Sequence, residues 1–228
     1  MTNVVLTVPN YAPLTAHIIE PDHAERQSVE QFICQRYWMK FNACLHELPR
    51  RILVVRDQQR QLIAACAIQY ADERPLFSEC YLPNTIQDTL AAHGIVAQRQ
   101  QLAEVGSMAC LRPRDLAPLV SAIVCYLTQQ QKQALIFTAT APLRRFLKHL
   151  QLPLQRLADA SADALSGDSV ARWGDYYQSQ PQVMAGRLCD GHFLLGKVSD
   201  RMSQPDDRHQ DEQVISGHAS GHWESVAC

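Results

Sequence analysis

The pattern of apolar and polar positions is clearest in the middle of the chain, where residues 102–110 are apolar or small apart from Glu104, as is typical of a buried strand. After a turn, the apolar positions recur at the three- and four-residue spacing of an amphipathic helix. These positions are Leu116, Leu119, Val120, Ile123, Val124 and Leu127. Residues 134–139 form a second short apolar run. The pattern therefore predicts a right-handed strand-helix-strand unit with parallel strands, which binds ligands at the carboxyl ends of its strands.

Further extended segments precede this unit. Residues 52–56 and 62–70 are apolar runs on either side of the polar turn 57–60, a pattern that predicts an antiparallel hairpin. Residues 16–20 and 76–82 also have strand-like patterns. The front half of the chain is therefore expected to form antiparallel strands.

Helices are predicted between these strands. Asp22 and Glu25 have the spacing of a capping box, which predicts a helix that starts there and ends near Met39. Residues 83–93 are predicted to be helical and to stop at Gly94. Another helix is expected after residue 140, where a threonine provides a suitable N-cap.

Together these elements follow the order β-α-β-β-β-α-β-α-β. An antiparallel front half followed by one parallel β-α-β crossover predicts a mixed α/β sheet of the acyl-CoA N-acyltransferase-like fold. Residues 199–228 are rich in Asp, Gln, His, Ser and Gly, which predicts a disordered tail. The expected organisation is one acyltransferase-like domain of residues 1–198 followed by this tail.

Composition narrows the classes of function. The chain has 228 residues, of which 46% are hydrophobic, and its net charge is −2. A globular core is therefore expected, and nucleic acid is a poor match as a partner. The longest apolar run, 116–127, is too short to span a bilayer, so no transmembrane segment is expected. The first ten residues lack the features of a signal peptide, which favours a cytoplasmic location.

The cysteines and histidines give no metal site. Eight cysteines are scattered without a Cys-x-x-Cys pair, which favours reduced thiols over disulfides in a protein without an export signal. His209, His218 and His222 lie in the polar tail, and the glycines around the last two argue against a helix that presents both to a metal. Neither a metal nor a tightly bound cofactor is expected.

Five groups of residues carry a family resemblance through their order and spacing. They are Glu25-Arg26 with Phe32-Ile33 and Arg36-Tyr37; Leu76-Phe77 with Glu79 and Tyr81-Leu82; Glu104-Val105-Gly106; Phe137-Thr138-Ala139-Thr140; and Trp173-Gly174 with Tyr176-Tyr177 and Pro181. In this combination the chain resembles the bacterial thermostable hemolysin family, from about Glu20 to Leu195. The resemblance implies a fold of the acyltransferase superfamily, close to that of the acyl-homoserine-lactone synthases, which also carry an early-helix arginine and a strand glutamate.

Glu104 is the candidate catalytic residue. If the carboxyl is buried in its apolar strand, its pKa rises and it can act as a general base for an attacking amine. The alternative is a structural carboxylate paired with Arg26 or Arg36. Those two arginines lie about 80° apart around their helix and are predicted to border one cleft as substrate-binding residues. Arg36 is a candidate for bidentate binding of a carboxylate, and solvated arginines are the alternative.

Other candidates for substrate binding surround Glu104 in the predicted fold. Glu79 is expected either to position the amine or to be a surface glutamate. The backbone at Val105, Gly106 and Ser107 is expected to polarise the thioester carbonyl. Thr138 is expected to be an acceptor near the site, whereas Thr140 is expected to be a helix cap.

The turn after the central strand bears on the acyl donor. In acetyltransferases this turn is rich in glycine, and its backbone N–H groups hold the coenzyme A pyrophosphate. Here residues 111–118 contain no glycine and two prolines, which removes two donors. Arg112 and Arg114 are predicted to bind the carrier phosphate instead, and a single phosphate on an acyl-carrier protein fits this turn at least as well as coenzyme A.

The expected function is an acyltransferase that moves an acyl group from a thioester co-substrate, acyl-carrier protein or acyl-coenzyme A, to a small amine such as an amino acid. A membrane-active hemolytic protein without enzymatic activity is the rival, and a binding module without turnover is a third possibility. Trp173, Tyr176 and Tyr177 either line an acyl pocket or fill the core.

Overall fold

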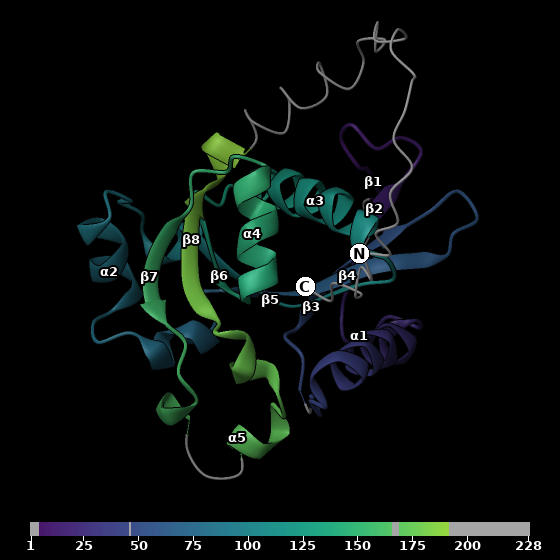
Figure 1. Cartoon of the computed structure of the whole chain (residues 1–228). Coiled ribbons are helices and arrows are strands. Elements are labelled where there is room, and N and C mark those ends of the chain that lie inside the picture. The colour runs from purple at the N-terminus through teal and green to yellow at the C-terminus, as the bar shows by residue number, and fades with distance from the viewer. Residues whose placement is uncertain (1–4, 46, 166–168, 192–228) are drawn as a thin grey trace, which may run out of the picture.

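A mixed eight-stranded sheet runs through the computed structural model, which describes residues 5–45, 47–165 and 169–191 (Figure 1). The strand order is β1-β2-β3-β4-β5-β6-β8-β7, and neighbouring strands are antiparallel except for the parallel pair β5 and β6. The strands are β1 Leu6–Thr7, β2 Thr15–Ile19, β3 Arg51–Arg56, β4 Leu62–Tyr70, β5 Leu102–Cys110, β6 Ala134–Ala139, β7 Gln155–Asp159 and β8 Gln182–Arg187. The predicted fold class is confirmed, and the predicted tail lies outside the described residues.

Helices cover both faces of the sheet. They are α1 Arg26–Phe41, α2 Ile86–Ala92, α3 Leu116–Gln129, α4 Ala141–His149 and the short α5 Ser169–Arg172. All six apolar positions predicted for the crossover helix are buried on α3. With α4, α3 packs on one face of the sheet, whereas α1 and α2 pack on the other (Figure 1). Within the described residues, no helix is both long and apolar enough to cross a membrane.

Two local predictions are wrong. The expected strand at 76–82 is a 3-10 helix, η1 Phe77–Tyr81. Its middle residue, Glu79, accepts the N–H of Leu76 at 2.7 Å and pairs with Arg99 at 2.7 Å, so tertiary contacts override the strand-like pattern. The expected capping box is also absent, because α1 begins only at Arg26 and the Glu25 carboxylate pairs with Arg56 at 2.8 Å.

The pairing of β5 is irregular near its middle on both sides. Its register with β4 shifts between Ala65 and Ala67, where Ser107 and Met108 together lie opposite a single β4 residue. Ser107 has a φ of 50°, which is uncommon for a residue with a side chain. The pairing of β5 with β6 ends at Val105 and Phe137, although both strands continue. A bulge of this kind leaves backbone groups unpaired, and such bulges are common beside active sites.

Candidate active site

Glu104 is the third residue of β5 and is only 7% exposed. Its Oε2 accepts the backbone N–H of Phe77 at 2.6 Å, and its Oε1 accepts that of Ser78 at 2.9 Å. Both donors belong to the first turn of η1, so this short helix orients the carboxylate. Neither Arg26 nor Arg36 forms an ion pair with Glu104 in the described part of the chain, so the pairing that the sequence left as an alternative is not formed.

Burial raises the pKa of the Glu104 carboxyl, and the hydrogen bonds from Ser78 and Phe77 reduce that rise without cancelling it. Desolvation disfavours the charged form, whereas each N–H that points at the carboxylate favours it. The result is a carboxyl group that takes up a proton more readily than an exposed glutamate. A base with a raised pKa suits proton transfer from an amine near neutral pH.

Glu104 forms part of the wall of a cavity of about 560 Å³, termed the Glu104 cavity. Four predicted site residues line it, namely Glu104, Gly106, Ser107 and Thr138. A Cβ added at Gly106 would meet nothing within 4 Å, so the glycine leaves open space there. The Thr138 hydroxyl is buried and has no hydrogen-bond partner among the described residues. The volume lies in the range of small-molecule sites.

Aromatic rings form one side of the Glu104 cavity. Trp173 packs against Phe77 and Tyr176, with ring centroids 5.6 Å and 5.0 Å apart. Tyr37 from α1 stacks on Tyr176 at 6.4 Å. Phe77 remains 48% exposed although it is apolar. These rings therefore both fill the space between α1 and η1 and present an apolar surface to a ligand.

Arg26 and Glu79 lie behind the walls of this cavity rather than inside it. The Arg26 guanidinium donates to the carbonyls of Arg50 at 2.6 Å and Pro49 at 2.8 Å, and so holds the segment that lines the cavity at Leu48 and Pro49. Glu79 forms a bidentate ion pair with Arg99, at 2.8 Å and 2.7 Å. This pair lowers the pKa of Glu79. Each contact fixes a segment on which Glu104 or its ligand depends.

The remaining predicted arginines gather near the end of β5. Arg36 donates to the carbonyl of Leu111 at 3.1 Å. Arg112 and Arg114 are exposed at the start of α3. The backbone N–H of Arg112 donates to Oδ2 of Asp115 at 2.9 Å, so this N–H is already engaged and a carboxylate lies beside it. The structure places these arginines outside the Glu104 cavity.

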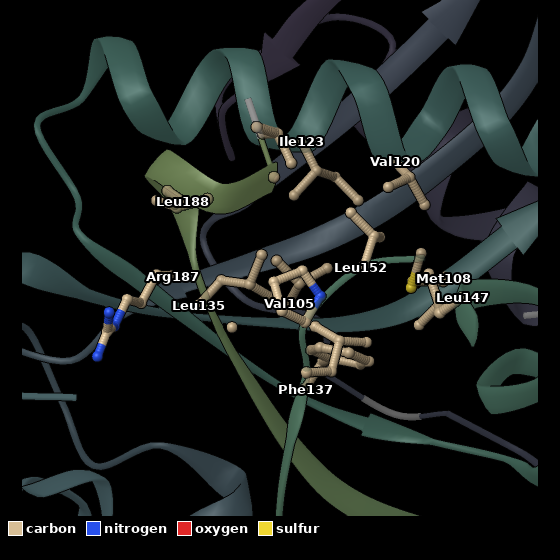
Figure 2. Close-up of a pocket in the computed structure, with 15 residues that line it drawn as sticks. Val105, Met108, Val120, Ile123, Leu135, Phe137, Leu147, Leu152, Arg187 and Leu188 are labelled. Carbon is tan, nitrogen blue, oxygen red and sulfur yellow. The ribbon is translucent and has the colours of Figure 1, made fainter. Parts of the chain in front are cut away.

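A second, narrow cavity of about 50 Å³ lies on the opposite face of the sheet, between α3, α4 and strands β5, β6 and β8 (Figure 2). Figure 2 shows Val120 and Ile123 on α3 directed toward the side chains of the sheet. Val105 and Met108 line both cavities, at the place where β5 separates from β6. The sequence gives no signal of this apolar cavity, because its lining residues have the pattern of an ordinary core.

Comparison with known proteins agrees with this architecture. The family model described as thermostable hemolysin matches residues 19–192. No protein with a curated description matches the chain in sequence.

Several solved structures are similar in fold. The apo form of TofI is 13% identical, covers 79% of this chain and 95% of its own, and has a TM-score of 0.53. FeeM, an N-acyl amino acid synthase from uncultured soil microbes, is 15% identical and has a TM-score of 0.54. The match covers 78% of this chain and 92% of FeeM. BjaI, a coenzyme A-dependent acyl-homoserine lactone synthase, is 12% identical, with 87% and 93% covered and a TM-score of 0.53.

These likenesses concern the fold, since the identities are low. The family match covers most of the chain, including β5, η1 and the aromatic segment that surround Glu104. The chain therefore belongs to the thermostable hemolysin family and has the acyltransferase-like α/β fold of the synthase structures.

Proposed function

We propose that the protein is an N-acyltransferase that moves an acyl group from a thioester carrier to the amine of a small acceptor such as an amino acid. The observation that carries this proposal is the buried carboxylate of Glu104 in a ligand-sized cavity that shares two wall residues with a narrow apolar cavity. The similarity in fold to FeeM, an N-acyl amino acid synthase, and to BjaI, an acyl-homoserine lactone synthase, supports the same class of reaction.

In the proposed reaction the acceptor amine enters the Glu104 cavity and its nitrogen attacks the thioester carbonyl carbon. Glu104 accepts the amine proton, directly or through a water molecule. The new carbon–nitrogen bond forms as the carbon–sulfur bond breaks. The leaving thiolate takes the proton from Glu104, directly or through water, so that the thiol departs and the carboxylate is restored. The unpaired backbone at the Ser107 bulge and the unpartnered Thr138 hydroxyl are candidate donors to the carbonyl oxygen.

The narrow apolar cavity is the proposed site of the acyl chain. Its lining is almost entirely apolar, and such a lining suits an alkyl chain better than a polar group. The chain would pass between β5 and β6 beyond Val105 and Phe137, where the pairing of the strands ends. A fatty acyl group is therefore a better fit than acetate.

The turn before α3 favours an acyl-carrier protein over coenzyme A as the donor. Pro113 has no N–H, and the N–H of Arg112 is bound by the Asp115 carboxylate, which would also repel a pyrophosphate. Arg112 and Arg114 are exposed and suit an acidic carrier surface with a single phosphate. A membrane-active role has less support, because its candidate apolar segment is buried as α3.

The test is acyl transfer by the purified protein. Acyl-carrier-protein and coenzyme A thioesters are mixed with a panel of amines, and released thiol and N-acyl product are measured. We expect Glu104→Gln to lower kcat by roughly a hundredfold or more, the usual range for loss of a general base. Glu25→Gln removes an exposed carboxylate elsewhere and is the matched control. Full activity of Glu104→Gln would rule out Glu104 as the general base.

The same variants can be compared in cells. Mass spectrometry of lipid extracts from cells that express the wild type should contain N-acyl products that are missing with Glu104→Gln. Lysis of liposomes by the purified protein without any acyl donor would instead support the hemolytic alternative.

A further inference from the structure

Two arginines on the wall of the Glu104 cavity have no assigned role. The charged residues that line this cavity are Glu47, Arg74, Glu104 and Arg172. Arg74 and Arg172 are exposed, and neither guanidinium forms a hydrogen bond or ion pair with any residue that the structure describes. Arg26 and Arg99, by contrast, are bound by carboxylates and carbonyls behind the cavity walls. The two cavity arginines are therefore available to a ligand.

Both arginines lie on segments next to the rings that surround Glu104. Arg74 lies three residues before Phe77, whose N–H holds the Glu104 carboxylate at 2.6 Å. Arg172 directly precedes Trp173, whose ring centroid lies 5.6 Å from that of Phe77. The ring pair thus joins the segment of Arg74 to the segment of Arg172. The carbonyl of Arg172 also accepts the N–H of Cys44 at 2.7 Å, which ties this segment to another part of the chain that lines the cavity.

We propose that Arg74 and Arg172 bind the carboxylate of the acceptor and that the acceptor is an α-amino acid with a large apolar side chain. This inference rests on the proposed acyl transfer and specifies its acceptor. A guanidinium forms paired, charge-assisted hydrogen bonds with a carboxylate. The amine then faces Glu104, and the side chain packs on the exposed ring of Phe77 and on Trp173.

The other charged residue of the cavity sharpens this assignment. Glu47 is exposed and lines the same cavity. Its carboxylate would repel a second acidic group on the acceptor, so aspartate and glutamate are expected to be poor substrates. The role that the sequence suggested for Arg36 in binding a carboxylate is thereby assigned to arginines that line the cavity.

The experiment compares acceptors with and without the carboxylate. Acyl transfer to L-phenylalanine, L-phenylalaninamide and phenethylamine is measured for the wild type, for Arg74→Gln with Arg172→Gln, and for the control Arg60→Gln. Arg60 is exposed on the turn between β3 and β4, far from the cavity in the sheet. Binding of L-phenylalanine and of phenethylamine is also measured by titration calorimetry, which needs no turnover.

We expect the wild type and Arg60→Gln to prefer L-phenylalanine over phenethylamine. The double variant should lose this preference through a rise of about ten- to a hundredfold in KM and Kd for L-phenylalanine, because a charged hydrogen bond is lost. The values for phenethylamine should not change. A preference that survives in the double variant, equal use of the two amines by the wild type, or no binding of L-phenylalanine would overturn the proposal. Thiol release that no amine stimulates would instead count against the acyl transfer itself, while the calorimetry still decides the carboxylate site.

Discussion

The two cavities beside β5 lie on opposite faces of one sheet and differ in almost every respect. The Glu104 cavity is wide and contains charged and aromatic side chains, whereas the cavity under α3 is narrow and apolar. One strand contributes to both, because Glu104 and Gly106 line the first cavity, whereas Val105 and Met108 line both cavities. In the proposed reaction, the site of proton transfer and the site of the acyl chain thus lie on opposite faces of the sheet. They meet where Val105 and Met108 line both cavities and the pairing of β5 with β6 ends.

The largest expected effect concerns pH and belongs to the Glu104 cavity alone. Burial raises the pKa of Glu104, and only its ionised form accepts a proton. The rate of acyl transfer should therefore rise tenfold per pH unit below that pKa and level off above it, with a midpoint above the ordinary 4.5. The amine of the acceptor also titrates, and the pH–rate profile of Glu104→Gln on the same acceptor reports that titration without the contribution of Glu104. A midpoint at or below 4.5 would contradict the assignment.

The raised pKa of Glu104 also predicts how the free energy of unfolding changes with pH. The folded state binds the Glu104 proton more tightly than the unfolded state, because the pKa of this group is raised on folding. Its contribution to the free energy of unfolding is therefore largest below pH 4.5 and declines as the pH rises through the folded pKa. Urea unfolding across this range should show a decline in the wild type that Glu104→Gln lacks.

A pair of cavity-filling variants tests the division between the two sites. Val120→Phe adds a ring to the apolar cavity and should lower kcat/KM for the longest accepted acyl chains about tenfold, as if about two buried methylenes were lost. Gly106→Val projects into the open space of the Glu104 cavity and should raise the KM for the acceptor instead. Each variant is the control for the other. A change of chain length preference in Gly106→Val alone would contradict the separation.

The smallest expected effect concerns the carrier outside both cavities. Arg112→Glu with Arg114→Glu reverses two exposed charges near the start of α3. The KM for an acyl-carrier-protein substrate should rise severalfold, with less effect on a short pantetheine thioester, because the attraction is electrostatic and acts over the carrier surface. Measurements at low and high salt check this. Equal use of both donors without salt dependence would count against a carrier protein.

Prediction from sequence succeeded where a periodic pattern decided the structure. The β5-α3-β6 unit and the buried position of Glu104 follow from an apolar run and a helical repeat. Prediction failed for the segment 76–82, because Glu79 binds Arg99 and the N–H groups of η1 bind Glu104. Such long-range contacts leave no local pattern in the sequence.

Side-chain roles were harder to predict than elements. Arg26 has the position on α1 expected of it, yet it binds backbone carbonyls rather than lining the cavity. Arg74 and Arg172 lie in irregular or short segments whose exposure to the cavity depends on the packing of Phe77 against Trp173. Sequence alone could have found these arginines only by chance.

Main-chain N–H groups orient the Glu104 carboxylate, and this determines which substitutions at positions 77 and 78 are compatible with that contact. Every residue except proline supplies an N–H at positions 77 and 78, so the two hydrogen bonds to the Glu104 carboxylate are kept after most substitutions there. The ring of Phe77, in contrast, faces the cavity and depends on its identity. In the proposed reaction, a substitution at position 77 would therefore change the preference for the acceptor and leave the backbone contact that orients Glu104 in place.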